Sequence, residues 1–248
     1  MAGVKGTAKK SDLGVRSATA VVMLLVAGTA LVQGGKVWAA FVALVTLGVL
    51  WEWLRLTAGL TRRTAKRIAW NVGGLVYVSS AAWMLFHMRV AMGMLSILIV
   101  VLAVIGTDVG AYFSGRLIGG PKIAPKISPS KTWAGLGGGM LGAAAGIAAA
   151  LGGAEWMRID RFSWIDIWPN ILIIGAATAV VAQAGDFFES WMKRRAGVKD
   201  SGKLLPGHGG LFDRVDGLLA VMFVIALLSL AKFSLAFGRG EVPFLGQP

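Results

Sequence analysis

The chain has 248 residues, of which 56% are hydrophobic and 15% charged, with a formal net charge of +13 and no cysteine. So few charges on so apolar a chain exclude a soluble globular domain and indicate an integral membrane protein. The absence of cysteine excludes disulfides, thiolate metal sites and cysteine nucleophiles. The positive charge would suit nucleic acid, but it is confined to short polar segments between apolar runs, so we expect no nucleic-acid partner.

Seven apolar runs approach or exceed the roughly 17–25 residues that a helix needs to cross a bilayer. In chain order they are residues 17–34, 37–54, 68–86, 90–113, 132–151, 169–187 and 214–237. We therefore predict an all-α, polytopic membrane helix bundle of about seven helices, within a range of about six to nine. The polar segments between the runs are short, so residues 1–248 are expected to form a single membrane-embedded domain.

The basic residues are distributed unevenly between the two sides of this bundle. If the N-terminus is cytoplasmic, the cytoplasmic segments contain 19 of the 25 Lys and Arg residues. Cytoplasmic loops of membrane proteins carry an excess of these residues, so the sequence predicts a cytoplasmic N-terminus. The polar segments 106–133 and 185–217 then lie at the cytoplasmic face, where they can meet cytosolic anions and anionic lipids.

Glycines in the fifth run repeat every four residues. Gly135 and Gly139 form one series, and Gly138, Gly142 and Gly146 form another, so each series lies along one face of a helix. Faces of small residues allow neighbouring membrane helices to approach closely. Tight packing within the bundle is the simplest interpretation. A homodimer interface and the wall of a lipid groove are alternatives between which the sequence does not choose.

The polar segment 106–133 contains groups suited to binding an anion or a metal ion. Asp108 follows an apolar run and is a candidate metal ligand. Directly before the fifth run lie Ser128, Ser130, Lys131 and Thr132. Ser130 or Thr132 could cap the following helix. Lys131 at a helix N-terminus opposes the helix dipole, and this position therefore favours an anionic ligand.

Five carboxylates lie in the segment 185–217, and four of them are near the ends of the two flanking runs. Asp186 and Glu189 are three residues apart, as are Asp213 and Asp216, so each pair can face one point from a helix. Two or three carboxylates together with ligand phosphates are a usual set of Mg²⁺ ligands at phosphoryl-transfer sites. The alternative is that these acids pair with nearby Lys and Arg residues to tether helix ends, and the spacing alone favours neither.

The same segment contains cations and a glycine-rich turn. Its cations are Lys193, Arg194, Arg195, Lys199, Lys203 and Arg214. Gly207, Gly209 and Gly210 allow backbone conformations that aim successive N–H groups at an anion. His208, within this turn, could donate a hydrogen bond to a phosphate, form a structural hydrogen bond or act as a general base.

Together these residues form a long, continuous motif. It reads Ser190-x-Met192-Lys193-Arg194, Lys199-Asp200-x-Gly202, Leu205-Pro206-x-His208-Gly209-Gly210-Leu211 and Asp213-Arg214-Val215-Asp216. With the upstream sequences DVGAYFSGR and SPSKTW, it resembles bacterial phosphatidate cytidylyltransferase, also called CDP-diacylglycerol synthase. That family often carries Glu where this chain has Ala134.

The resemblance implies an enzyme that transfers the cytidylyl (CMP) group from CTP to phosphatidate, giving CDP-diacylglycerol and pyrophosphate for phospholipid biosynthesis. It implies dependence on Mg²⁺, with a second cation as an option. It also implies a multi-pass protein of the bacterial inner membrane whose active site faces the cytoplasm. Its partners would then be CTP, phosphatidate and the lipid bilayer.

Applied to this chain, the resemblance suggests a role for each of the polar residues above. The predicted catalytic residues are Lys193, Lys199, His208, Asp213 and Asp216. The predicted substrate-binding residues are Ser128, Ser130, Lys131, Thr132, Ser190, Arg194, Gly209, Gly210 and Arg214. The predicted metal ligands are Asp186, Asp213 and Asp216, with Asp108 as a weaker fourth candidate.

Four other functions compete with this one. Another CTP-dependent lipid cytidylyltransferase or a polyprenol kinase would use a similar site. CDP-alcohol phosphotransferases are disfavoured because their DxxDGxxAR motif is absent. An ion or anion transporter is the least favoured, because its acids should lie near the middle of the membrane and at both faces, whereas these acids cluster at one face.

Overall fold

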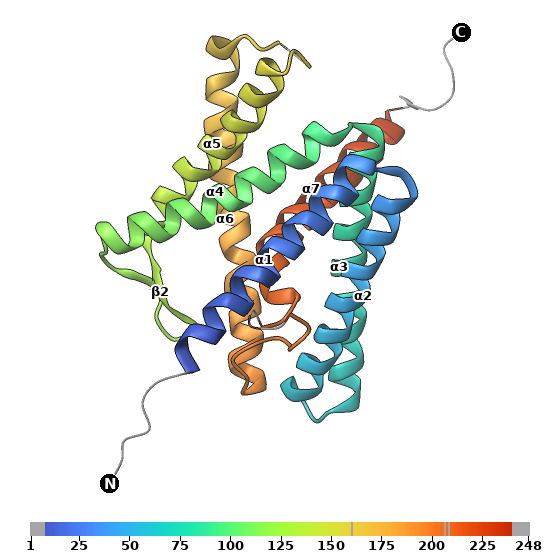
Figure 1. The fold of residues 1–248 in the computed structure, drawn as a ribbon. Helices are drawn as coiled ribbons and strands as arrows, with labels where there is room; N and C mark the ends of the chain where they lie inside the picture. Colours follow the sequence, from blue (N-terminus) through green and yellow to red (C-terminus); the bar gives the residue numbers. More distant parts are fainter. Residues whose placement is uncertain (1–7, 160, 206, 208, 240–248) are drawn as a thin grey trace.

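The computed structural model describes residues 8–159, 161–205, 207 and 209–239, which form seven helices and one two-stranded hairpin (Figure 1). The elements are α1 (Ala8–Gln33), α2 (Gly35–Leu60), α3 (Thr64–Ala91), α4 (Met94–Leu117), β1 (Lys122–Ala124), β2 (Ser128–Thr132), α5 (Trp133–Trp156), α6 (Trp164–Ala196) and α7 (Phe212–Gly238). Of the described helices, α2 to α7 are long and apolar enough to cross a membrane, and the apolar part of α1, Ser17–Gln33, is shorter. The predicted polytopic helix bundle is confirmed, apart from the hairpin.

Apolar side chains cover the outside of this bundle. Exposed large hydrophobic residues occur on every long helix, among them Leu24, Leu44, Leu75, Ile105, Leu141, Ile173 and Leu228. Such a surface would be unfavourable in water, whereas the hydrocarbon of a bilayer solvates it without cost. The outer surface therefore has the character of a lipid-facing one.

The basic polar segments gather at one end of the bundle. The turn between α2 and α3, the hairpin and the loop between α6 and α7 all occupy the lower part of Figure 1. The turn carries Arg62 and Arg63, and the hairpin carries Lys122, Lys126 and Lys131. This gathering agrees with the distribution of Lys and Arg on which the predicted orientation rests. The cytoplasmic location of the N-terminus itself stays a prediction.

The segment between α4 and α5 is more ordered than the sequence predicted. β1 and β2 pair antiparallel, with Lys122 opposite Thr132 and Ala124 opposite Ser128. At the end of β2, the Thr132 hydroxyl accepts a hydrogen bond from the Gly135 N–H at 3.0 Å and so caps α5. One of the two predicted capping residues is therefore confirmed, and the hairpin projects Lys131 toward α6.

Helix α6 extends beyond the predicted run 169–187 at both ends. It continues without a break to Ala196 and stops at Gly197, whose φ of 73° places it in the left-handed region that favours glycine. The Val198 N–H donates to the Lys193 carbonyl at 3.0 Å, which closes the end of the helix. Asp186, Glu189 and Lys193 therefore lie on one continuous helix, as their spacing predicted.

An aromatic core joins α2, α3, α6 and α7 beneath this polar end. The Trp53 ring lies 6.0 Å from Tyr77, 5.9 Å from Phe188 and 5.7 Å from Phe212, measured between ring centroids. The Trp53 indole N–H also donates to the Trp70 carbonyl at 3.0 Å. Because aromatic pairs at these distances prefer specific relative orientations, this core sets the positions of the ends of α6 and α7.

The glycine faces of α5 pack against α4. Gly142 lies against the Gly106 backbone, and Gly138 lies against Gly110, so closely that a Cβ on either glycine of α5 would collide with α4. Gly146 contacts the Leu102 backbone in the same way. The predicted tight packing is confirmed, and within this chain α4 covers that glycine face. A homodimer through another surface stays a prediction.

Replacing Gly142 by Ala tests the close packing of α4 and α5. The new methyl group would meet the Gly106 carbonyl, which is backbone and cannot rotate away, so the helices must separate. We expect a loss of about 1–3 kcal/mol of stability and a lower melting temperature in detergent. The matched control is Gly137→Ala on the same helix, where a Cβ meets nothing within 4 Å. An unchanged melting temperature for Gly142→Ala would contradict this packing.

Candidate functional site

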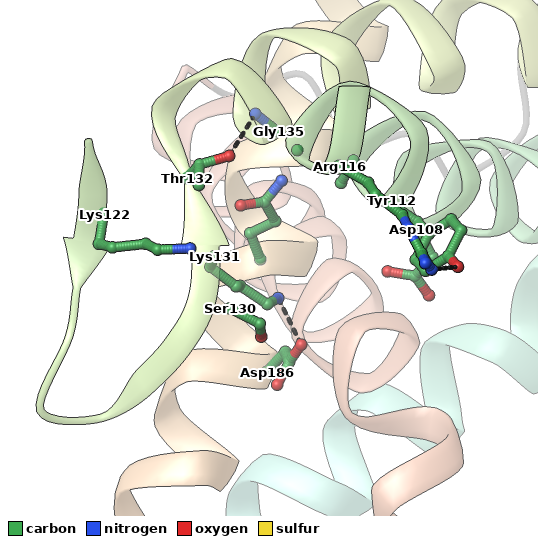
Figure 2. Close-up of a pocket in the computed structure, with 12 residues that line it drawn as sticks. Asp108, Tyr112, Arg116, Lys122, Ser130, Lys131, Thr132, Gly135 and Asp186 are labelled. Atoms are coloured by element: carbon green, nitrogen blue, oxygen red, sulfur yellow. Dashed lines mark hydrogen bonds and ion pairs between the residues drawn. The ribbon is translucent and has the colours of Figure 1, made fainter. Parts of the chain in front are cut away.

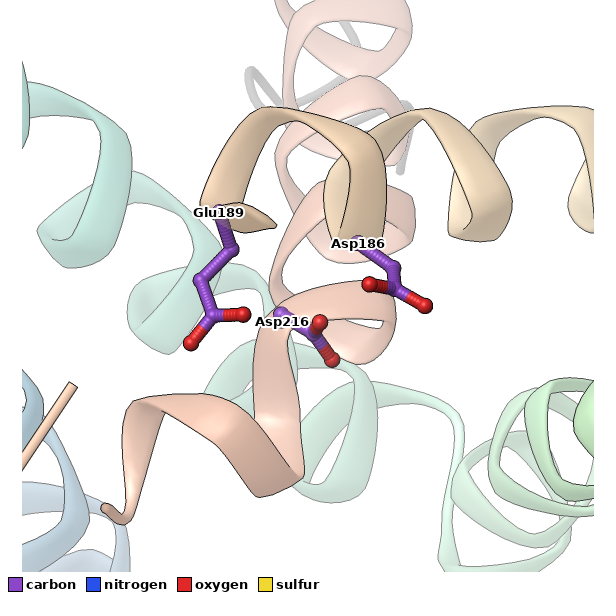
Figure 3. Close-up of side chains that lie close together, drawn as sticks. All are labelled: Asp186, Glu189 and Asp216. Carbon is purple, nitrogen blue, oxygen red and sulfur yellow. The ribbon is translucent and has the colours of Figure 1, made fainter. Parts of the chain in front are cut away.

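Three carboxylates converge where α6 meets the start of α7. Oxygen atoms of Asp186, Glu189 and Asp216 all lie within 4.8 Å of one another in the part of the chain that the structure describes. Figure 3 shows the three side chains turned toward the space between the two helices. Carboxylates this close repel one another unless a cation or proton offsets their charge. The group therefore needs positive charge or a proton nearby, and its oxygen atoms are placed where they could hold a metal ion.

The surroundings of Glu189 test whether this group fits a metal ion. Glu189 is 1% exposed, and its Oε1 atom has no hydrogen-bond partner among the described residues. Buried carboxylate oxygens in proteins normally receive hydrogen bonds or coordinate cations. Three converging carboxylates are also oxygen ligands of the type that Mg²⁺ prefers. The residues present therefore fit the predicted cation.

Lys193 connects this group with Asp213. Its Nζ atom lies 2.5 Å from Glu189 Oε2 and 2.6 Å from Asp213 Oδ1. The second oxygen of Asp213 accepts hydrogen bonds from the Ser201 N–H and the Gly210 N–H, both at 2.9 Å, and lies 3.0 Å from the Ser201 hydroxyl oxygen. Asp213 is thus occupied by the loop before α7, and the structure groups Glu189 with Asp186 and Asp216. A metal-binding role for Asp213 stays a prediction.

A buried carboxylate from α2 binds the other side of the same loop. Glu52 is 0% exposed, and its Oε1 accepts from the Leu211 N–H at 2.9 Å. Its Oε2 accepts from the Phe212 N–H and from the Ser201 hydroxyl, both at 2.8 Å. Glu52 therefore satisfies N–H groups that the start of a helix leaves without internal partners. A carboxylate is also the charge that the positive end of the α7 dipole favours.

Sequence reasoning missed Glu52, although a signal was present. It lies inside the apolar run 37–54, and an ionisable residue within a predicted membrane helix is by default a candidate for function. The same carboxylate explains two glycines of the motif. A Cβ on Gly202 would collide with Glu52, and a Cβ on Gly210 would collide with Ser201. These glycines are required by the close approach of Glu52 and its serine partner.

The glycine-rich turn was predicted to aim its N–H groups at an anion. Gly207 and Gly209 have positive φ angles of 75° and 86°, which agrees with the expected unusual backbone. The Gly210 N–H donates to Asp213, so the anion that it meets here is a side chain of the protein. His208 lies outside the described residues. Phosphate binding by Gly209 and Gly210 stays a prediction.

A cavity of about 370 Å³ lies beside the three carboxylates, between α4, the hairpin and α6 (Figure 2). It is lined by Asp108, Ala111, Tyr112, Gly115, Arg116, Lys122, Ser130, Lys131, Thr132, Gly135, Gln183 and Asp186. Asp186 belongs both to this lining and to the carboxylate group. The two polar segments predicted from sequence, 106–133 and 185–217, therefore meet at Asp186.

Cations surround most of the cavity. Lys131 extends from β2 and forms an ion pair with Asp186, and its ammonium lies 5.2 Å from the centre of the Phe187 ring. Arg116 donates a hydrogen bond to the Tyr112 hydroxyl at 2.7 Å, and Lys122 enters from β1. Three cations face two carboxylates, Asp108 and Asp186. The lining has the charge expected of a site for a phosphorylated ligand.

The remaining predicted residues occupy different positions around this site. Ser190 donates to Asp186 at 3.2 Å, one turn further along α6. Asp108 lines the cavity but is not among the three converging carboxylates. The described lining does not include Ser128, Arg194, Lys199 or Arg214, and the last three are exposed. Lys122 and Gln183 line the cavity and were not predicted from sequence.

The chain is similar to known proteins over most of this region. The model of the Cytidylyltransferase family matches residues 61–231. The phosphatidate cytidylyltransferase of Brucella suis biovar 1 (strain 1330) is 37% identical over 182 residues, covering 70% of this chain and 60% of that protein. That of Helicobacter pylori (strain ATCC 700392 / 26695) is 37% identical over 144 residues, covering 58% and 50%. The chain thus spans at most 60% of the length of these relatives.

Replacing Glu52 by Gln tests the support of the loop and of α7. Both oxygens of Glu52 accept from N–H donors, so either orientation of a Gln side chain sets its NH₂ group against a donor. We expect a loss of about 3 kcal/mol of stability, measured as a lower melting temperature in detergent. The control is Asp166→Asn, an exposed acid in the first turn of α6. Wild-type stability of Glu52→Gln would show that these hydrogen bonds contribute little.

Proposed function

The chain belongs to the cytidylyltransferase family, and from this premise we propose that it transfers the cytidylyl group of CTP to phosphatidate, releasing pyrophosphate and forming CDP-diacylglycerol. One observation carries the proposal. A cavity lined by Arg116, Lys122 and Lys131 meets, at Asp186, a group of three carboxylates suited to a divalent cation. The names of the bacterial relatives support phosphatidate as the acceptor.

In the proposed reaction, an oxygen of the phosphatidate phosphate attacks the α-phosphorus of CTP. A new P–O bond forms, the bond from the α-phosphorus to the bridging oxygen breaks, and pyrophosphate leaves with that electron pair. The second pKa of a phosphomonoester is near 6, so at neutral pH the attacking oxygen is largely deprotonated and needs little help from a base. Catalysis then consists mainly of positioning and charge stabilisation.

The residues of the cavity suit these two tasks. Lys131 and Arg116, on β2 and α4, would bind phosphate oxygens and offset the charge of the leaving pyrophosphate. Asp186, Glu189 and Asp216 would hold Mg²⁺, which supplies Lewis-acid stabilisation of phosphate charge when bound. A second cation and the metal-binding role of Asp213 are further parts of the proposal.

We also propose that the site faces the cytoplasm of a bacterial inner membrane. The support is the gathering of the basic segments at the end of the bundle where the cavity lies. At that face the head group of phosphatidate can reach the cavity while its acyl chains remain in the bilayer. CTP is a cytosolic anion and can approach from the water side.

The activity is tested with purified protein, CTP, phosphatidate and Mg²⁺, scored for CDP-diacylglycerol and pyrophosphate. We expect both products in equal amounts, complete loss with excess EDTA, and recovery when Mg²⁺ is restored. Reactions with dCTP and with a polyprenol in place of phosphatidate define the nucleotide and the acceptor. Formation of a polyprenol phosphate without CDP-diacylglycerol would favour the kinase alternative. No nucleotide-dependent product with any acceptor would overturn the proposal.

The variants Asp186→Asn and Asp216→Asn test the carboxylate group. Each removes one charged ligand while keeping the shape of the side chain, so we expect turnover to fall by about 100-fold or more and Mg²⁺ dependence to shift to higher concentrations. Asp166→Asn, the same substitution at the opposite end of α6, serves as the control and should keep wild-type turnover. Near-normal turnover by both site variants would remove these residues from the metal site.

A further inference from the structure

The side chain of Gln183 on α6 has an unexplained hydrogen-bonding group. Gln183 is 4% exposed and lines the cavity. Its Nε2 atom has no hydrogen-bond partner among the described residues. A buried amide N–H without an acceptor is unfavourable, and native proteins rarely leave one in that state. Among the described residues this donor has no acceptor, and a ligand bound in the cavity can supply one.

The Gln183 side chain lines the cavity from the place where α4, α5 and α6 pack together. Gly139 of α5 lies beside it, and a Cβ at that position would come within 3.1 Å of Gln183 Nε2 and 3.3 Å of Thr107 Cγ2 on α4. Gln183 is thus enclosed where three helices meet. It also precedes Asp186 by three residues and Ser190 by seven, so the three side chains share one stripe of α6. The donor continues the polar row that faces the cavity.

The charge of the cavity identifies the kind of acceptor. Arg116, Lys122 and Lys131 line it, and Ser130 adds a hydroxyl. A phosphate group can accept from such cations, from a hydroxyl and from an amide at the same time, because each of its oxygens has several lone pairs. A neutral ligand would offer these cations no opposite charge.

We propose that Gln183 Nε2 donates a hydrogen bond to a non-bridging phosphate oxygen of a substrate in the cavity, and so selects and orients that phosphate. The inference rests on the proposed function, since CTP and phosphatidate both carry phosphate. Gln183 lies outside the motif that runs from Ser190 to Asp216. The contact adds an uncharged amide donor to the cations and hydroxyls that line the cavity.

Two variants of Gln183 test the contact. Gln183→Met keeps the length of the side chain and removes the donor, and Gln183→Glu keeps the shape and places a negative charge next to the phosphate. The Michaelis constants for CTP and for phosphatidate are measured separately with Mg²⁺ present. We expect the constant for one substrate to rise about tenfold in Gln183→Met and further in Gln183→Glu. The substrate affected identifies whether the nucleotide or the lipid supplies the phosphate.

A second measurement separates a ligand contact from a structural role. Removing a donor that has no partner should leave the melting temperature of substrate-free Gln183→Met unchanged or higher, while the stabilisation produced by added CTP or pyrophosphate shrinks. The matched control is Trp38→Phe. It removes Trp38 Nε1, a buried donor that also lacks a described partner but does not line the cavity. Both Michaelis constants should stay at wild-type values in this control.

Two results would overturn the inference. In the first, the wild type forms CDP-diacylglycerol, while Gln183→Met keeps both Michaelis constants and is stabilised by ligand as much as the wild type. The proposed function then stands without the contact. In the second, substrate-free Gln183→Met melts lower with unchanged Michaelis constants, which assigns Gln183 to packing. If the wild type is inactive, the proposed function fails. The contact is then judged from pyrophosphate binding: weaker binding by Gln183→Met than by the wild type supports it, and equal binding overturns it.

Discussion

The buried carboxylate of Glu52 is the contact on which the polar end of this protein depends. A charge in a membrane-spanning helix is unfavourable unless donors surround it. Here the donors are the Leu211 and Phe212 N–H groups and the Ser201 hydroxyl, so the loop and the start of α7 wrap around one acid. Glu52 precedes the region that matches the family model, residues 61–231, yet it binds the core of that region. Helix α2 is therefore part of the site's support.

From Glu52 a series of polar contacts leads to the cavity. The Ser201 N–H donates to Asp213, Asp213 pairs with Lys193, and Lys193 pairs with Glu189. Glu189 belongs to the same carboxylate group as Asp186, which pairs with Lys131 of the hairpin. Of the three converging carboxylates, Asp186 pairs with Lys131 and Glu189 pairs with Lys193, while Asp216 has no ion pair among the described residues. Three acids thus meet two ammonium groups, and the remaining negative charge lies at the point where a cation would bind.

The other half of the site is the cavity, and its walls are positioned by backbone contacts rather than by charge. Membrane helices gain little from excluding apolar side chains from lipid, so close van der Waals packing has to hold them together. Gly138 and Gly142 of α5 give α4 this approach, and they place the start of α5 beside Asp108 and Arg116. Because α5 begins where β2 ends, the same packing also sets the position of Lys131. A phosphate site that is assembled from the ends of separate helices requires helix pairs that pack rigidly in this way.

The sequence by itself determined the membrane spans, because bilayer thickness sets the length of an apolar run. It also determined a cap at Ser130 or Thr132, the tight glycine packing of α5 and the two polar segments, since each follows from local spacing along the chain. It could not determine whether Glu189 or Asp213 lies with Asp186 and Asp216. Glu189 is three residues from Asp186, and Asp213 is three residues from Asp216, so helical spacing allows either acid to join the group. The hairpin, Glu52 and Gln183 were likewise decided only by tertiary structure. Their roles depend on groups that meet across the fold, as Glu52 and Phe212 do over 160 residues of chain.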